Sequence, residues 1–167
     1  CQAAGVCGKG RGGAVNLKIS FSWVGLLIFA LPMFINIAYA LLPPAGEAAP
    51  PAPVKRWVEN IEKVSRMAYL AAVVLLVSRD PLSFRSAWLY MGLAFLALYY
   101  IVWIRYFAAG RDIALLERPF FFVPMPLAVF PVLYYLCAAL WLHNLPAAGL
   151  MVIFGAAHLA VSIQSFR

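Results

Sequence analysis

The stretch Tyr99–Tyr135, YYIVWIRYFAAGRDIALLERPFFFVPMPLAVFPVLYY, joins the end of one apolar helix to a charged turn and then to a second apolar segment. Pro124, Pro126 and Pro131 interrupt that second segment. A proline lacks the N–H that a helix uses and clashes with the carbonyl four residues before it. In a bilayer the freed carbonyls have no water to bond, so such a helix is stable only where it packs against other helices or lines a cavity. We therefore expect this hairpin at the centre of a helical bundle.

The composition of the chain is that of a membrane protein. Of its 167 residues, 65% are hydrophobic and 11% are charged, and the mean hydropathy is +0.89. Typical soluble domains have roughly 45–50% apolar and about 25% charged residues. These values predict an all-α integral membrane protein, and the length fits a single domain.

The apolar runs predict a bundle of five transmembrane helices, of which the fourth is kinked by its prolines. One run, Met67–Val77, is short for a span, so four crossings are the alternative. Residues 1–18 are basic and glycine-rich without an apolar period, and we expect a flexible tail. The rest, 19–167, forms one domain. The predicted spans are 19–42, 64–78, 87–109, 120–142 and 145–166.

The segment 54–66 precedes the short second span and has a different character. It predicts an amphipathic helix at the membrane surface or against one end of the bundle, continuous with the span that follows. The residues that share its apolar face are Trp57, Ile61, Val64 and Ala68. The charged pairs at i,i+4 spacing, which stabilise a helix, are Glu59–Lys63 and Glu62–Arg66.

The net charge of +7 comes from 13 basic and 6 acidic residues, which lie in the tail and the turns. Beside apolar spans, basic residues are expected to contact anionic lipid headgroups. No basic surface with exposed aromatic residues is evident outside the spans, which argues against nucleic-acid binding. Placing 45–66, 105–118 and the C-terminus on one side collects eight of the thirteen basic residues. The positive-inside rule then predicts a cytoplasmic C-terminus and an N-terminus outside.

His158 lies near the middle of the last predicted span, and Ser162 follows it one turn later on the same face. An ionisable group at that depth is a functional hypothesis by default. It could relay a proton or hold a polar group of a ligand. The simpler interpretation is a neutral imidazole that hydrogen-bonds to a neighbouring helix.

Arg105 lies one turn inside the third span, before a turn that carries both signs of charge. This turn could bind a phosphate or carboxylate headgroup, or its charges could form a network among themselves, which is the simpler interpretation. Asp112 or Glu117 is the nearest acidic partner in sequence for Arg105. The charged residues of the group are Arg105, Arg111, Asp112, Glu117 and Arg118.

Polar and aromatic residues within the spans give three further candidates. Asn36 is the one amide of the first span, and an asparagine there usually bonds to another helix. Tyr134 and Trp141 belong to an aromatic stripe at helical spacing in the fourth span. Such stripes are mostly packing surfaces, whereas proline-bent helices with aromatic flanks can also form a ligand pocket.

The sequence gives no pattern for a catalytic or metal site. His143 and His158 lie at different depths, about 18 Å apart along the last helix, so they cannot hold one haem. Cys1, Cys7 and Cys137 have no metal-binding spacing. We see no nucleophile with a base and no paired carboxylates in the spans. We therefore expect no metal and no cofactor, and nothing points to an enzyme.

Three segments have a family likeness. The segments ENIEKVSRM (59–67), YYIVWIRYFAAGRDIALLERP (99–119) and PMPLAVFPVLYYLCAALWL (124–142) resemble small bacterial five-span membrane proteins of Gram-positive type, which have no assigned function. The likeness extends from about residue 32 to the C-terminus and excludes the tail. It implies a bacterial plasma membrane and a five-helix fold. It supplies no catalytic residues, and the WxPP pattern of five-span porphyrin-binding translocators is lacking.

Two functional hypotheses remain. In the first, the protein binds or helps to translocate a small hydrophobic or amphipathic ligand or lipid, beside His158 and the proline-kinked helix. In the second, it is a structural or accessory subunit that packs against a membrane partner, or against a second copy, through the amphipathic helix 54–66.

Overall fold

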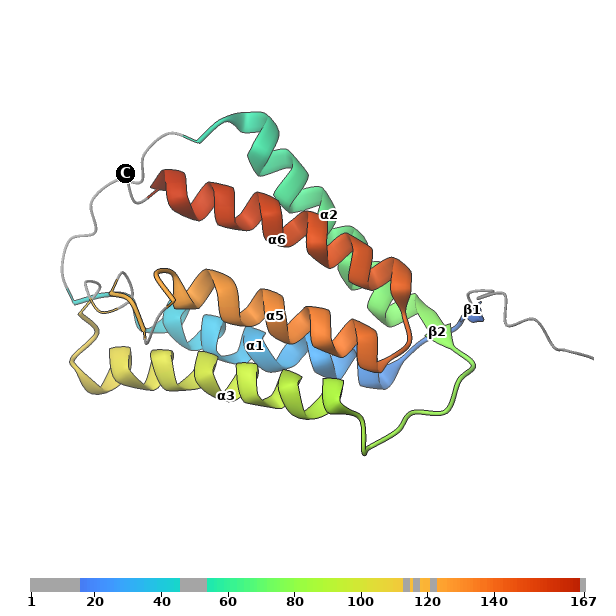
Figure 1. Ribbon diagram of the computed structural model, residues 1–167. Helices are drawn as coiled ribbons and strands as arrows, with labels where there is room; N and C mark the ends of the chain where they lie inside the picture. Colours follow the sequence, from blue (N-terminus) through green and yellow to red (C-terminus); the bar gives the residue numbers. More distant parts are fainter. Residues whose placement is uncertain (1–15, 46–53, 113–114, 116–117, 121–122, 166–167) are drawn as a thin grey trace, which may run out of the picture.

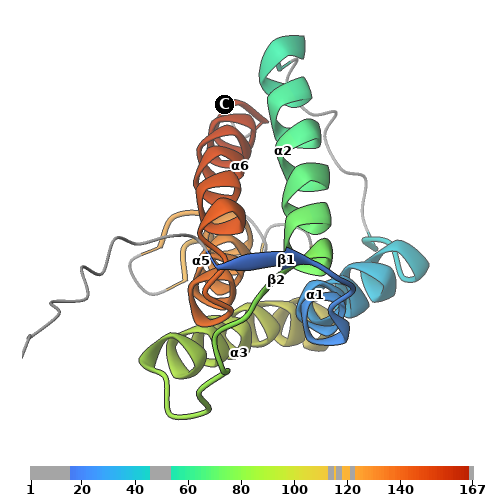
Figure 2. The ribbon, with the colours of Figure 1, turned by 90° about the vertical axis from the view of Figure 1, so that its right-hand side faces the viewer.

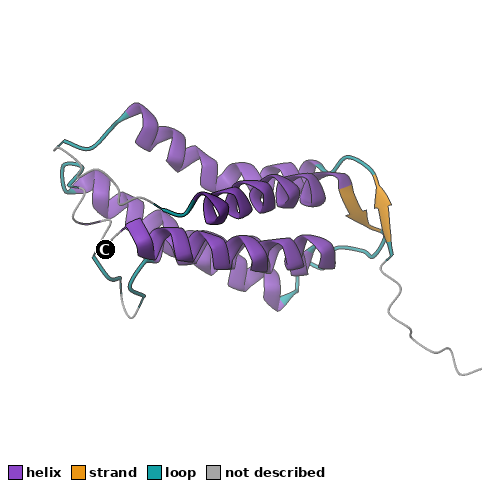
Figure 3. Ribbon diagram, turned by 90° about the horizontal axis from the view of Figure 1, so that it is seen from above, coloured by secondary structure: helices purple, strands orange, loops and turns teal. Residues whose placement is uncertain are grey.

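The computed structural model describes residues 16–45, 54–112, 115, 118–120 and 123–165. Within these residues the chain is predominantly helical, and the helices run back and forth along a common direction (Figure 1). The helices are α1 (Trp23–Leu41), α2 (Arg56–Leu75), α3 (Ala87–Ala108), α5 (Pro126–Trp141) and α6 (Leu145–Ser165). Two short strands, β1 (Leu17–Ile19) and β2 (Leu76–Ser78), pair antiparallel at one end of the bundle (Figure 3).

Three of the helices are long and apolar enough to cross a membrane, namely α1, α3 and the 20 residues Leu145–Gln164 of α6. Only 17–33% of the residues in their apolar windows are buried inside the protein, so most of their apolar surface faces outward. Outward apolar surface of this extent is what lipid would cover. A fourth helix, α5, is apolar but shorter. The predicted helical membrane protein is thus supported by the composition and exposure of these helices.

The helices form two groups. In one, α2 packs along α6; in the other, α3 packs along α5, and α1 lies beside them. The groups meet where α5 contacts α6. Gly155 lies at this contact, and a Cβ there would come within 2.7 Å of Val132 Cγ1. Toward the end where α6 finishes, α2 and α6 diverge from α1, α3 and α5 (Figures 1 and 2).

At the opposite end the groups are joined by backbone hydrogen bonds. The amides of Ser20 and Ser22 donate to the carbonyls of Leu75 and Val74, at 2.9 and 2.8 Å. The last carbonyls of a helix have no partner within the helix, so the chain before α1 satisfies the end of α2. The start of α1 lies close against this end because Gly25 has no side chain, and a Cβ there would be 2.1 Å from the Val73 carbonyl oxygen.

Asn144 connects the two helices of the α2–α6 pair at this end, and it is completely buried. Its Nδ2 donates to the carbonyls of Ala72 and Leu76 in α2, at 2.9 and 2.8 Å. Its Oδ1 accepts from the amide of Ala147 at 3.0 Å, which is the N-cap interaction of α6. One side chain thus caps the start of α6 and binds the end of α2.

Several predicted boundaries differ from the structure. The flexible tail was expected to extend to residue 18 and the first span to begin at 19, whereas Leu17–Ile19 is β1 and α1 begins at Trp23. The second span was expected to reach 78, but α2 ends at Leu75 and β2 follows. Both differences have one cause, the pairing of β1 with β2, which the helical period of neither segment reveals. The N-terminal residues 1–15, with Cys1 and Cys7, lie outside the described residues.

The fourth helix is also shorter than predicted. It begins at Pro126 instead of residue 120, because proline is favourable at the first helical position and the residue before a proline avoids the helical conformation. Phe120 and Val123 form an isolated bridge instead. As expected, α2 continues without a break from the charged segment into the apolar one.

The apolar face of α2 was expected to lie against the bundle or a membrane surface. In the structure this face points away from the other helices, and Trp57, Ile61 and Val64 are 62%, 41% and 68% exposed. Of the charged residues on this helix, Glu62 contacts His158 of α6 and Arg66 lines the cleft, whereas Arg56 and Lys63 are exposed. This arrangement suits a helix with lipid outside and polar contacts inside.

Candidate functional site

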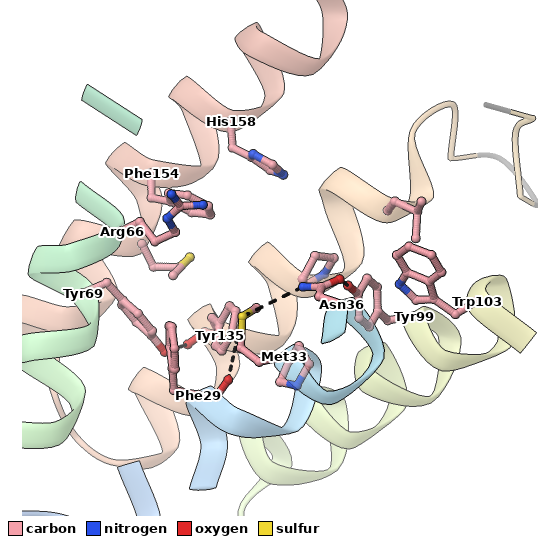
Figure 4. Close-up of a pocket in the computed structure, with 14 residues that line it drawn as sticks. Phe29, Met33, Asn36, Arg66, Tyr69, Tyr99, Trp103, Tyr135, Phe154 and His158 are labelled. Atoms are coloured by element: carbon pink, nitrogen blue, oxygen red, sulfur yellow. Dashed lines mark hydrogen bonds between the residues drawn. The ribbon is translucent and has the colours of Figure 1, made fainter. Parts of the chain in front are cut away.

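A cleft lies between the α2–α6 pair and helices α1, α3 and α5 (Figure 4). Fourteen side chains line it, and they come from all five helices. The cleft encloses about 740 Å³, its open mouth included. The part of this space that a small molecule could occupy is about 210 Å³, which is smaller than the roughly 300–1,000 Å³ of typical small-molecule sites.

Charged groups lie on the wall that α2 and α6 form. His158 donates from Nδ1 to Glu62 Oε1 at 3.1 Å, since a carboxylate only accepts. The side chains of His158 and Glu62 are 29% and 14% exposed. The Phe154 ring stacks on the imidazole at 5.1 Å. Arg66, one turn after Glu62, lines the cleft, and its guanidinium makes no ion pair or hydrogen bond with the described residues.

Asn36 and aromatic side chains form the opposite wall. The Tyr99 hydroxyl donates to Asn36 Oδ1 at 2.8 Å, and Asn36 Nδ2 meets only the Met33 sulfur, at 4.0 Å. The Trp103 indole is 95% buried, since 5% of its surface is exposed. Its Nε1 lies close to Tyr99 but has no partner with hydrogen-bond geometry among the described residues.

Two prolines help to build the cleft, and both line it: Pro32 in α1 and Pro131 in α5. Pro32 cannot donate to the carbonyl of Ile28. The Tyr134 hydroxyl of α5 donates to that carbonyl instead, at 3.0 Å. Two more tyrosines bind α1 carbonyls nearby: Tyr135 to Phe29 and Tyr100 to Leu31. The proline-containing part of α1 is therefore held by tyrosines from its neighbours, as a broken helix in a bilayer requires.

The structure brings two of the predicted site residues, His158 and Asn36, into the same cleft. Ser162 lies one turn beyond His158, and its hydroxyl donates to the His158 backbone carbonyl at 2.9 Å. This bond is internal to α6. The hydrogen bond from His158 to α2 agrees with the interpretation of an imidazole bonded to a neighbouring helix. Its partner, however, is the carboxylate of Glu62.

The other predicted site residues lie elsewhere. The Arg105 guanidinium carbon lies 5.0 Å from the centre of the Phe120 ring, a cation–π contact. Of its two suggested partners, Asp112 and Glu117, the second is outside the described residues. Tyr134 and Trp141 line a separate apolar groove between α1, α3 and α5. Trp141 Nε1 donates to the Ser83 carbonyl at 2.8 Å. The polar atoms of Tyr134 and Trp141 are thus used in packing the helices.

Arg66, Glu62, Tyr99 and Trp103 line or border the cleft and were not among the predicted site residues. The expected Glu62–Arg66 pair is not present within ion-pair distance, because Glu62 turns to His158; the Glu59–Lys63 pair is present at 3.9 Å. The sequence signal that could have identified Glu62 and Arg66 is their position on α2, on the side opposite the apolar stripe.

The described residues contain no group of three or more side chains that could hold a metal ion. His143 is exposed and has a positive φ of 53° at the end of α5. The amides of His143 and Asn144 donate to the carbonyls of Leu140 and Ala139, which is the Schellman arrangement of a helix end. His143 therefore ends a helix. Cys137 is buried and packs against Gly92 of α3.

Comparison with known proteins gives no relative: no protein-family model, no curated protein and no solved structure matches the chain.

Proposed function

We propose that the protein is a multi-pass membrane protein that binds a small amphipathic ligand in the cleft between its two helix groups. The observation that carries the proposal is the composition of the cleft, in which Arg66, Asn36 and His158 share one space with aromatic and proline side chains, and His158 is bonded to Glu62 beside it. Ionisable residues at such positions in a membrane bundle are costly and mark substrate or ion sites.

We further propose that all five helices cross the bilayer. In support, the two ends of α2 lie at opposite ends of the bundle, beside those of the antiparallel helix α6 (Figure 1). The charged half of α2 is compatible with this position because its apolar stripe faces outward, Glu62 contacts His158 of α6, and Arg66 lines the cleft. The sequence resemblance adds the bacterial plasma membrane as the location.

The proposed orientation has a cytoplasmic C-terminus. The start of α2 and the ends of α3 and α6 lie together at one end of the bundle, which agrees with the grouping of basic residues used for the prediction (Figure 1). The residues beyond Ser165, including Arg167, are outside the described part. A cysteine-labelling experiment at Leu41 and at Arg79 would test the sidedness with a membrane-impermeant reagent.

Native mass spectrometry of the protein released from nanodiscs tests ligand binding. We expect a retained molecule of defined mass. The variant Met33→Trp places an indole in the cleft and should abolish retention. Ile37→Trp is the matched control, because Ile37 is on the same helix, 54% exposed and not among the cleft residues. Equal retention by both variants would contradict a site in the cleft, and a bare wild-type protein would contradict tight binding.

One observation favours the second hypothesis, the accessory subunit. The outward stripe of α2 belongs to a helix of 20 residues, which is long enough for a membrane span but is not among the helices apolar enough to be one. A partner helix could cover this stripe in place of lipid. The double variant Trp57→Ala, Ile61→Ala would then release a stoichiometric partner and leave any ligand in the cleft. Loss of the ligand together with the partner would contradict this assignment.

A further inference from the structure

We infer that the ligand of the cleft is an anionic amphipath, an acyl chain that ends in a carboxylate or phosphate, and that Arg66 binds its head group. This inference rests on the proposed function and names the chemistry of its ligand.

The charge pairing around Arg66 is the first argument. The two acidic residues nearest to it on α2 have other partners: Glu62 pairs with His158 at 3.1 Å and Glu59 with Lys63 at 3.9 Å. The guanidinium is left with no anion among the described residues. An arginine presents a planar fork of donors that fits a carboxylate or phosphate in a bidentate manner. Arg66 is an exposed residue that lines the cleft, so its donors are available to an anion that enters there.

The depth of Arg66 strengthens this argument. Arg66 lies nine residues before the end of α2, which corresponds to about 14 Å along the helix at 1.5 Å per residue. In a hydrocarbon core about 30 Å thick, this position is close to the middle. An arginine there faces a water-filled or ligand-filled space or pairs with an anion. A neutral ligand that fills the cleft would exclude water and leave the guanidinium unpaired.

The polar groups of the facing wall point to an acceptor-rich ligand as well. Asn36 Nδ2 has only a sulfur contact, and Trp103 Nε1 has no partner among the described residues. Together with Arg66 they give the cleft unused donors on α1, α2 and α3 (Figure 4). Of these three side chains Trp103 is buried, Asn36 is half-buried and Arg66 is exposed. A buried donor without an acceptor is costly. Carboxylate and phosphate oxygens supply acceptors only.

The apolar lining explains why the anion should carry a chain. Phe29, Pro32, Leu127, Pro131 and Met151 line the same space and offer no polar side-chain group. A free inorganic anion would leave this surface wet, whereas an acyl chain would bury it. The head group of a membrane phospholipid and that of a single-chain amphipath share the required chemistry, and the experiment must separate them.

The test uses Trp103 as the reporter in phosphatidylcholine nanodiscs. Bromine quenches tryptophan fluorescence on contact, so 12-bromododecanoate and the uncharged 12-bromododecanol serve as probes. The difference in quenching between the wild type and Trp103→Phe isolates the cleft from the exposed tryptophans. Inorganic phosphate is added as a competitor without a chain.

We expect saturable quenching by the carboxylate probe and much weaker quenching by the alcohol. Arg66→Gln should reduce the affinity for the carboxylate at least about tenfold, as expected for loss of a charge-assisted hydrogen bond, and Arg66→Lys should recover part of it. Arg56→Gln is the control, since Arg56 lies on the same helix, exposed and outside the cleft lining, and it should bind as the wild type does.

The other outcomes separate the two levels of the argument. Equal binding of both probes, or of the carboxylate probe by wild type and Arg66→Gln, overturns the anionic head group and leaves the cleft as a ligand site. Competition by millimolar phosphate as effective as by dodecanoate overturns the acyl chain. Failure of both probes to reach Trp103 overturns the proposed function itself. In native mass spectrometry a retained phospholipid mass, as opposed to a single-chain mass, identifies the bilayer as the source.

Discussion

Asn144 offers a direct test of how α2 and α6 are held together at one end of the bundle. Its side chain makes three hydrogen bonds, two to α2 carbonyls and one that caps α6, and it is completely buried. Asn144→Ala removes all three at once. With a net contribution of about 1 kcal/mol per hydrogen bond, and more where a buried partner is left unsatisfied, the free energy of unfolding should fall by about 3 kcal/mol.

The assay is unfolding by SDS titration in mixed micelles, followed by circular dichroism. Asn60→Ala is the matched control, because Asn60 is exposed on α2 and should change stability by less than about 0.5 kcal/mol. Asn144→Ser retains a capping oxygen for the Ala147 amide and loses both donors, so it should recover about 1 kcal/mol relative to alanine. If Asn144→Ala unfolds at the same point as Asn60→Ala, the proposed role of this residue is wrong.

Three further predictions concern individual contacts. Gly25→Ala should strongly destabilise the protein because its Cβ would be 2.1 Å from the Val73 oxygen. Gly149→Ala, with open space around it, should instead stabilise the protein by about 1 kcal/mol. The SDS concentration at the unfolding midpoint measures both effects, and equal shifts for the two variants would refute the prediction. Tyr134→Phe should cost about 1–2 kcal/mol because the Ile28 carbonyl loses its donor, and the cost should shrink in a Pro32→Ala background, where the helix amide replaces it; an unchanged cost refutes the proposed compensation. Glu62→Gln and His158→Ala should be non-additive in a double-mutant cycle because the two side chains contact each other, whereas Lys63→Gln and His158→Ala should be additive.

Much of the helical architecture follows from local sequence. The apolar runs and the prolines predict helices close to those observed, and a proline at the first helical position explains why α5 begins at Pro126. The differences arise where distant segments pair through the backbone. Leu17–Ile19 is a strand because β2, more than fifty residues later, presents free backbone groups beside it. The pattern of apolar residues within either segment does not show that the two segments pair.

The site could be predicted only in part, for a related reason. His158 and Asn36 are recognisable because a polar side chain within an apolar span is unusual. Arg66 and Glu62 lie in a charged segment, where local spacing predicts that they pair with each other. The structure replaces that pair with the bond from His158 to Glu62, since α6 lies alongside α2. That Arg66 lacks the partner predicted from its spacing thus depends on a contact between α2 and α6.

The position of the cleft follows from how unequally the two ends of the bundle are connected. At the β1–β2 end, the amides of Ser20 and Ser22, just before α1, bind the last carbonyls of α2 and join the two groups. Asn144 holds the start of α6 to the same end of α2. Further along, Gly155 allows α5 and α6 to touch, and His158 lies about one turn beyond this contact, where the groups separate. An opening motion of α2 and α6 would therefore pivot about the fixed end and change the width of the cleft at Arg66 and His158 more than at Asn144. Substitutions at Asn144 should accordingly reduce stability, whereas substitutions at Arg66 should change binding with little effect on folding.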